Sequence, residues 1–158
     1  MENQIFNIAE DGINGAEGYA QATIDGVIHR LFDAKKIEAK FDKQKSELRV
    51  MGSRATQNRA KGWKGTGSMT LYYATSVFRE AAIKYIETGK DLFFDLLVVN
   101  EDPQTTLGKQ TMLFTGCNID STILAKLDID ADAMDEEVSF TFTGVKMLDK
   151  FSRPTYIQ

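Results

Sequence analysis

The pattern of apolar and polar positions in residues 61–73 changes part-way from a glycine-spaced segment to strict alternation. The apolar face of the alternating part carries Met69, Leu71 and Tyr73. The polar face carries Thr66, Ser68, Thr70 and Tyr72. A period of two is typical of a β-strand with one apolar and one polar face, so we predict a strand here.

The glycines of this segment match phosphate-binding motifs only in part. Gly62 and Gly67 have the spacing of a phosphate-binding loop, but Ser68 occupies the place of its essential lysine. The dinucleotide-binding fingerprint also fails, because Thr70 stands where its third glycine belongs. Both motifs open a helix, whereas this segment leads into a strand. We therefore expect the glycines to permit bends and close backbone approach rather than to bind a nucleotide.

A second alternating stretch, residues 35–50, is sparsely apolar and densely charged. Its first apolar positions are Ile37, Ala39 and Phe41. The parity then inverts to Leu48 and Val50, which predicts a turn or bulge near residues 45–47. Because so thin an apolar face gains little from burial, we predict a strand pair that projects from its domain and pairs with something outside it. An ordinary solvated hairpin is the alternative, and residues 51–60 are expected to form a loop.

Other strand signals are spread over the chain. Asp25-Gly26 separates two apolar runs, residues 19–24 and 27–32, and predicts a short hairpin because both turn residues tolerate positive φ. The remaining predicted strands are residues 92–99, expected to be central and buried, and apolar on both faces except at Asp95; residues 110–117 and 118–126, either two strands or one long strand bent at Gly116; and residues 138–147, with a bulge at Gly144.

One segment, Ser76 to Thr88, has apolar residues at helical spacing. Thr75 or Ser76 can cap its N-terminus, and Gly89 can take the left-handed conformation that ends many helices. Residues 128–137 are acidic and are expected to form a loop.

These elements predict the fold class. About seven strands that do not alternate with helices disfavour a parallel βαβ sheet. We expect a mainly β protein with one α-helix: an antiparallel β-sandwich or partly open barrel with a flanking helix and extended hairpins. Residues 1–18 are predicted to be an N-terminal arm, and residues 19–158 a single domain.

Composition narrows the functional classes. The chain has 158 residues, 42% of them hydrophobic, and a net charge of -4, which disfavours a nucleic-acid binder that uses its whole surface. Its single cysteine, Cys117, excludes an intramolecular disulfide framework. The N-terminus lacks the pattern of a signal peptide, and no apolar run is long enough to span a membrane, so no stable membrane association is expected.

Few residues suit catalysis or metal binding. His29 is the only histidine, and nothing in the sequence places it near Cys117. Asp128, Asp130 and Asp132 have the spacing of calcium ligands. That loop also needs Gly at its sixth and Glu at its twelfth position, where Ala133 and Ser139 stand. We therefore expect no catalytic residues, no metal site and no cofactor, and a role other than that of an enzyme.

The charge distribution is asymmetric along the chain. Between Leu48 and Arg79 there is no acidic residue, whereas residues 128–137 are rich in acid. The basic residues of the first segment are Arg49, Arg54, Arg59, Lys61, Lys64 and Arg79. One interpretation is head-to-tail self-association of a basic and an acidic face, as rings and filaments require. A nucleic-acid patch, or two unrelated solvated loops, are the alternatives.

Several segments resemble tail tube proteins of contractile phages of Gram-positive bacteria and of related phage-tail-like bacteriocins and defective prophages. The segments that carry this resemblance are Arg54-Ala-Thr-Gln, Gly62-Trp-Lys-Gly-Thr-Gly-Ser-Met-Thr-Leu-Tyr-Tyr, Thr88-Gly-Lys-Asp, Asn100-Glu-Asp-Pro, Gly116-Cys-Asn-Ile-Asp-Ser and Ile123-Leu-Ala-Lys-Leu-Asp. They follow the family order from about Tyr19 to Phe151, and no single one is a mechanistic signature.

The resemblance implies a structural subunit that assembles into hexameric rings, stacked as a hollow tube inside a contractile sheath. Hairpins of neighbouring subunits would then pair into a continuous barrel around the lumen, which removes free strand edges. The residues expected to face that lumen are Glu38, Lys40, Asp42, Thr66, Ser68 and Thr70. The residues expected to contact other subunits are Arg49, Arg54, Arg59, Lys61, Lys64, Asp128, Asp130 and Asp132, together with the N-terminal arm.

The resemblance also implies partners and a location. The partners would be further copies of the chain, the sheath protein, baseplate or initiator proteins, a tail terminator and, as an open alternative, DNA in the lumen. The subunit would be made in the bacterial cytoplasm and released within a virion or phage-tail-like particle. Two alternatives remain: a secretion-system tube protein of related fold, and a monomeric β-barrel that binds a ligand.

Overall fold

The computed structural model describes residue 13 and residues 15–31, 34–105 and 107–152. These residues form a 3-10 helix, η1 (Gly15–Glu17), eight strands and one α-helix. The strand pairs are antiparallel, and the hydrogen-bonded order ends at β2 and β3, so the sheet is not closed. The predicted class, mainly antiparallel β with one helix, is confirmed, and the open sheet order is consistent with the partly open barrel that was expected. Most of the predicted arm, residues 1–18, lies outside the described residues, and the single domain over residues 19–158 stays a prediction.

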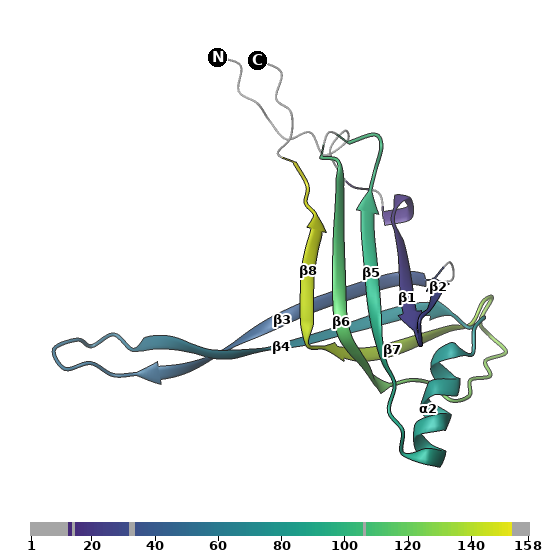
Figure 1. Cartoon of the computed structure of the whole chain (residues 1–158), viewed down its shortest axis with the longest axis horizontal. Helices are drawn as coiled ribbons and strands as arrows, with labels where there is room; N and C mark the ends of the chain where they lie inside the picture. The colour runs from purple at the N-terminus through teal and green to yellow at the C-terminus, as the bar shows by residue number, and fades with distance from the viewer. Residues whose placement is uncertain (1–12, 14, 32–33, 106, 153–158) are drawn as a thin grey trace. The chain divides into compact units, whose positions relative to one another are not determined.

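The chain divides into two compact units. The first comprises the described residues of 1–32, 93–117 and 144–158. Its strand order is β2 (Val27–Arg30), β1 (Tyr19–Ile24), β5 (Phe93–Glu101) and β6 (Lys109–Ser121), and β8 (Gly144–Asp149) also pairs with β6 (Figure 1). The predicted Asp25-Gly26 hairpin is confirmed, with positive φ angles of 51° and 79°.

The core of this first unit consists of alternate residues on adjacent strands. Ala22 and Ile24 of β1 are buried, and they pair with Leu96 and Phe94 of β5. β5 lies between β1 and β6, so its predicted central position is confirmed. Its predicted burial is wrong at Phe93, which is exposed.

β6 continues from the first unit into the second. The interpretation of residues 110–126 as one long strand is confirmed as far as Ser121, where the strand ends. Gly116 has a φ of 64°, which favours glycine, directly before the boundary at Cys117. β7 pairs with the end of β6, where Asn118 lies opposite Thr141. β8 pairs with the preceding part of β6, where Thr115 lies opposite Gly144, and the register along β6 is the same for both strands. The bulge predicted at Gly144 is therefore wrong: the pairing is interrupted there, but its register does not shift.

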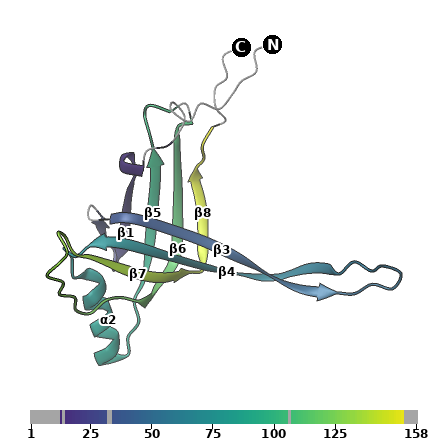
Figure 2. The same cartoon turned by 180° about the vertical axis from the view of Figure 1, so that it is seen from behind.

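The second unit comprises the described residues of 33–92 and 118–143. Its strand order is the end of β6, then β7 (Asp135–Phe142), β4 (Gln57–Tyr72) and β3 (Ala34–Leu48), and it contains the helix α2 (Val77–Thr88) (Figure 2). The buried apolar residues of this unit are Met69, Leu71, Phe78, Val138, Phe140 and Phe142.

The projecting hairpin is formed by other strands than the sequence predicted. Residues 35–50 are not a strand pair: β3 is one strand of 15 residues, and its partner is β4, of 16 residues. β4 begins at Gln57, so residues 57–60, expected in a loop, are strand. The irregularity predicted near residues 45–47 is present as a register shift between Gln44 and Lys45, but the unpaired residue is Lys61 of β4. The error arose because the strand's partner is not evident from its own pattern.

The helix matches its prediction at both ends. Ser76 occupies the N-cap position without a side-chain hydrogen bond, and the Thr75 hydroxyl instead accepts one from the Val77 amide at 3.4 Å. Gly89 has a φ of 72°, and its amide donates to the Tyr85 carbonyl at 2.8 Å. Among the described residues, no helix is both long and apolar enough to cross a membrane.

Candidate functional site

One face of the β3–β4–β7 sheet gathers the residues that were predicted to face a lumen. Glu38 of β3 pairs with Ser68 of β4, and Lys40 pairs with Thr66. Directly paired residues of antiparallel strands point to the same face, and alternate residues share it. By this register, all six predicted residues lie on one polar face, which we call the hydroxyl face: Glu38, Lys40, Asp42, Thr66, Ser68 and Thr70. That this face lines a channel stays a prediction.

The structure adds residues to the hydroxyl face that sequence reasoning missed. β7 contributes Glu137, Ser139 and Thr141, which pair with Thr70, Ser68 and Thr66. Lys64, predicted as a contact between subunits, pairs with Asp42 and so belongs to the hydroxyl face as well. Its even position in the strand was the signal that could have placed it there.

The charges of the hydroxyl face are balanced. Within residues 36–42, 64–70 and 137–141 its cations are Lys36, Lys40 and Lys64, and its anions are Glu38, Asp42 and Glu137. The Lys36 Nζ lies 3.3 Å from the Glu38 carboxylate, and Lys64 is directly opposite Asp42. Neighbouring opposite charges on one face of a sheet are mutually favourable, so the face combines hydroxyls with compensated ions.

The opposite face of the sheet explains the glycines of β4. Gly67 pairs with Phe140, and Gly65 pairs with Phe142. A Cβ atom at either glycine would lie less than 3.0 Å from the ring of its partner, which is closer than real contacts allow. The glycines therefore leave room for aromatic rings to lie against the strand, as the expectation of close approach requires. They lie inside strand β4 and not at the start of a helix, where a phosphate-binding loop would place them.

This apolar face continues past the end of β7 without a covering strand among the described residues. β7 ends at Phe142, opposite Gly65, whereas β3 and β4 extend further (Figure 2). Trp63 packs against Phe142 with ring centroids 6.0 Å apart, yet it is 46% exposed. Phe41, which pairs with Gly65, is 60% exposed. Two aromatic side chains of the hairpin thus present apolar surface to solvent.

The outer edge of β3 is also unpaired. Among the described residues β3 pairs only with β4, so the backbone groups of its other edge are not used by another strand over 15 residues. A long open edge is a template for pairing with another chain. Its dense Lys and Glu residues are the kind that limits unselective pairing.

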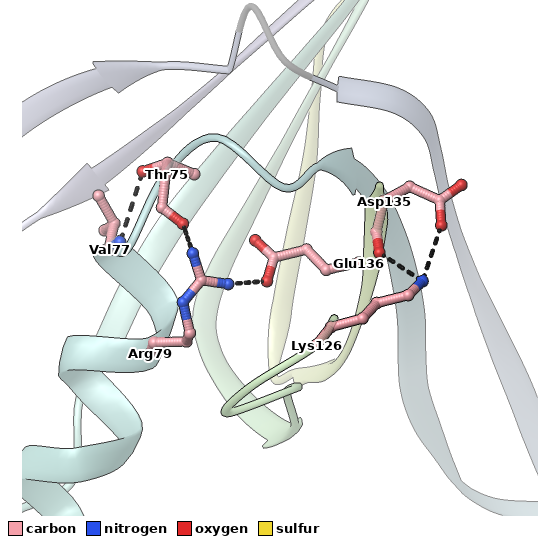
Figure 3. Close-up of polar contacts among 6 residues, drawn as sticks. All are labelled: Thr75, Val77, Arg79, Lys126, Asp135 and Glu136. Atoms are coloured by element: carbon pink, nitrogen blue, oxygen red, sulfur yellow. Dashed lines mark hydrogen bonds and ion pairs between the residues drawn. The ribbon is translucent and has the colours of Figure 1, made fainter. Parts of the chain in front are cut away.

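Ion pairs stabilise the part of the second unit where β7 begins, away from the turn of the β3–β4 hairpin (Figure 3). Arg79 of α2 donates hydrogen bonds to the Glu136 carboxylate and to the Thr75 carbonyl, and its guanidinium lies 4.2 Å from the centre of the Tyr73 ring. The Glu136 side chain is only 1% exposed, so this contact compensates a buried charge. Glu136 and Asp135 were expected in an acidic loop, but the structure places both in β7.

Asp135 forms ion pairs with two lysines, Lys35 and Lys126. Its carboxylate accepts from Lys35 at 3.1 Å and from Lys126 at 3.4 Å, and Lys126 also donates to its carbonyl at 2.9 Å. The hydrogen bond from Lys35 has the largest effect and that from Lys126 the next largest, and together they hold the pKa of the Asp135 carboxyl below its usual value of 3.8. Asp135, the first residue of β7, thereby connects β7 to β3 and to the loop that follows β6.

Lys64 lies on the hydroxyl face and Lys61 is exposed in β4, whereas the other residues predicted to contact other subunits lie in two separate places. Arg49, Arg54 and Arg59 belong to the exposed end of the β3–β4 hairpin. Asp128, Asp130 and Asp132 are exposed in the loop between β6 and β7. The Asp128 carboxylate accepts from the Asp130 amide at 3.0 Å, an interaction that supports the loop itself.

His29 and Cys117 are not brought together in the first unit. His29 is in β2 and Cys117 in β6, and β1 and β5 lie between these strands in the sheet order. Burial raises the pKa of the Cys117 thiol to about 12, and the charge of Asp95 adds to this effect. A thiol with so high a pKa is a poor nucleophile at neutral pH.

A groove runs beside α2 in the second unit. It is open, has a volume of about 490 Å³, and is lined by Ala82, Tyr85 and Ile86 of the helix and by residues 118–122 and Leu124. The Thr122 hydroxyl is buried there, and it has no hydrogen-bond partner among the residues that the structure describes. An open groove differs from the enclosed pocket that a small-molecule-binding barrel would have.

Comparison with known proteins places the chain in a family. The family model described as "Phage tail tube protein" matches residues 7–149. The phage-like element PBSX protein XkdM of Bacillus subtilis (strain 168) is 37% identical over 140 residues, which are 84% of this chain and 95% of that protein.

Solved structures agree at the level of the fold. In the sheath–tube complex of an extracellular contractile injection system, one chain superposes with a TM-score of 0.67 at 12% identity, covering 89% of this chain and 94% of its own. The SPP1 tail tube matches with a TM-score of 0.58 at 13% identity, covering 85% and 78%. From the family match and the identity to its relative, we conclude that this chain belongs to the phage tail tube protein family.

Proposed function

We propose that this chain is the structural subunit of the inner tube of a contractile phage tail or phage-tail-like particle, and that its copies assemble into hexameric rings stacked as a tube. The observation that carries the proposal is the long hairpin of β3 and β4. It combines a charge-balanced hydroxyl face, an apolar face that exposes Phe41 and Trp63, and an outer edge that pairs with no other strand of the described residues over 15 residues.

These three features have one common physical solution. Pairing the β3 edge with a neighbouring subunit satisfies its backbone groups, as closure does in a barrel. Packing subunits against one another covers the exposed aromatic side chains. The hydroxyl face then remains in contact with water in the lumen, where its six predicted residues and Lys64 form the lining.

The mechanism is mechanical rather than catalytic. The tube stays rigid while a surrounding sheath shortens and drives it through the target envelope. The sheath, baseplate or initiator proteins and a terminator are its proposed partners, in line with the assemblies in which chains of this fold occur. The subunit is made in the bacterial cytoplasm and acts within the particle. A charge-balanced lumen suits the passage of DNA, although a DNA-free particle could use the same subunit.

Electron microscopy of the purified, concentrated protein tests this proposal. Rings or tubes in negative-stain images support it, or its close alternative, a secretion-system tube protein. A particle that stays monomeric even in the presence of its baseplate or initiator complex contradicts it and favours a ligand-binding barrel. Neighbouring capsid genes would separate a DNA-carrying tail from a DNA-free particle.

A substitution on each face of β3 sharpens the test. Phe41→Lys places a charge on the apolar face at an exposed position, so the monomer should fold but tubes should not form. Gln44→Lys, at an exposed position of the same strand, is the matched control and should still give tubes. Leu71→Lys is less informative, because Leu71 is fully buried and its replacement would also unfold the subunit. Normal tubes from Phe41→Lys would show that the face is misassigned.

A further inference from the structure

Three aliphatic side chains of the second unit are almost fully exposed, and they occur in two short turns. Met51 is 101% exposed, and Leu127 and Ile129 are each 96% exposed. Single exposed apolar residues are common on protein surfaces. Complete exposure of three large ones at turn positions, where polar residues normally lie, indicates surfaces that another molecule covers.

The first turn is the end of the β3–β4 hairpin, which we call the basic tip (residues 48–59). The Ser53 amide donates to the Val50 carbonyl at 3.3 Å, and Gly52 has a φ of 85°. This is the geometry of a turn with glycine at its third position, and it leaves Met51 at the outermost one. Leu48 and Val50 beside it are each nearly half exposed. The tip contains Arg49, Arg54 and Arg59 and no acidic residue.

The second turn is the acidic loop (residues 127–132). The Asp128 carboxylate accepts from the Asp130 amide at 3.0 Å, so Ile129 stands at the apex of that turn. The loop contains Asp128, Asp130 and Asp132 and no basic residue. It therefore has the same arrangement as the basic tip, exposed aliphatic side chains within a set of like charges, but with the opposite sign.

The two turns lie at opposite ends of the same sheet. β4 runs from the basic tip to Tyr72, and Tyr72 pairs with Asp135, the first residue of β7 after the acidic loop. Figure 1 shows the hairpin end and the loop before β7 on opposite sides of the second unit. The two turns of one copy thus cannot meet each other, but those of two copies can.

We propose that the acidic loop of one copy docks on the basic tip of a second copy, in a head-to-tail contact. Leu127 and Ile129 pack against Val50 and Met51 at its centre, and the aspartates and arginines form a rim around them, as in other protein interfaces. Contact between two basic tips or two acidic loops would oppose like charges, so a two-fold contact is disfavoured. Repeating a heterologous contact builds rings or stacks. The inference deepens the proposed tube function, because it names the surfaces by which copies meet.

Pairwise cross-linking tests the contact directly. Met51→Cys and Ile129→Cys are made separately in a Cys117→Ala background, mixed, and oxidised with copper phenanthroline. Each disulfide joins two thiols and passes their two electrons to the oxidant. We expect a covalent dimer from the mixture and little or none from either variant alone. Ile83→Cys, on the exposed face of α2, replaces Ile129→Cys in the control and should give no dimer with Met51→Cys.

Two other outcomes overturn the contact. A dimer formed by Met51→Cys alone indicates tips that meet each other, and absence of the mixed dimer shows that the two turns do not approach. This readout needs association but not a finished tube. Tubes without the mixed dimer would leave the proposed function standing and reject the contact. A mixed dimer from a protein that never forms rings or tubes, even with its initiator, would support the contact and reject the proposed function.

Charge reversal provides an independent test. Arg49→Glu/Arg54→Glu makes the tip acidic, and Asp130→Arg/Asp132→Arg makes the loop basic. Each double variant alone should lose assembly, whereas an equal mixture of the two, or one chain with all four changes, should regain it. Lys84→Glu/Lys90→Glu on and after α2 is the control and should assemble normally. Failure of both the mixture and the four-fold variant, with each folded, would overturn the charge pairing.

Discussion

Gly67 of β4 pairs with Phe140 of β7, and the phenyl ring lies where a side chain on Gly67 would begin. A Cβ atom there would also lie less than 3.0 Å from the Glu38 carbonyl of β3. The glycine is thus enclosed by both neighbouring strands. This relationship ties the apolar face of the sheet to the hydroxyl face, because it fixes the register that aligns Glu38, Ser68 and Ser139.

Gly67→Ala should therefore destabilise the protein through overpacking. Both the ring and the backbone of neighbouring strands must move, at a cost of about 1–3 kcal/mol in the free energy of unfolding. Gly62→Ala on the same strand is the matched control, because a Cβ atom at Gly62 meets nothing within 4 Å. Its effect should stay within about 0.5 kcal/mol. Urea unfolding measures both, and equal stability of the two variants would show that the close approach at Gly67 is unimportant.

Arg79→Met should be more damaging, because it leaves the Glu136 carboxylate buried without its cation. Breaking one partner of a buried ion pair costs about 3–5 kcal/mol. Replacing both partners, in Arg79→Met/Glu136→Met, removes the uncompensated charge and should recover much of that loss. Lys84→Met, at an exposed position of α2, controls for the loss of a cation from the helix. Chemical unfolding of the three variants gives the comparison, and a double variant less stable than Arg79→Met would contradict it.

Asp135 should make stability depend on pH in the acid range. The pKa of its carboxyl is lowered in the folded protein, so the contribution is present above the unfolded value of 3.8 and is lost as the pH falls through the folded pKa. The difference in unfolding midpoint between the native protein and Asp135→Asn should be small at pH 7, because the site is exposed, and should shrink below pH 4. Asp132→Asn, in the acidic loop, is the control. A difference that grows on acidification would reverse the assigned sign.

Cys117 should resist thiol reagents in the folded protein. The thiol is buried, and its pKa is raised to about 12, so almost no thiolate exists at pH 8. Reaction with Ellman's reagent at pH 8 should be slow in buffer and become complete in denaturant. Met51→Cys in the Cys117→Ala background supplies an exposed thiol as the positive control. Rapid native labelling of Cys117 would show that the first unit opens readily.

The location of the strands and of the helix followed from local patterns, whereas their partners did not. Asp25-Gly26, Gly89 and the alternation of residues 66–72 are local signals, and each was confirmed because backbone conformation and period depend on nearby residues. The extent of β4 was missed at Gln57 because a polar strand at a hairpin end has no apolar face to mark it. Asp135 and Glu136 were assigned to a loop because acidity alone does not reveal a buried arginine partner.

The sequence by itself determined the fold class, the family, the helix and the set of polar residues that share one face of β3 and β4. The fold class and the helix depend on periodicity and on turn residues, which are local properties of the chain. The family and the six residues expected to face a lumen were implied by the resemblance to tail tube proteins. Only the tertiary structure decided that Lys64 joins this face, that Gly65 and Gly67 make room for aromatic rings, and that the exposed aliphatic side chains stand at opposite ends of one sheet. Register and strand order bring together residues that lie far apart in the sequence, and no local pattern specifies which strands will pair.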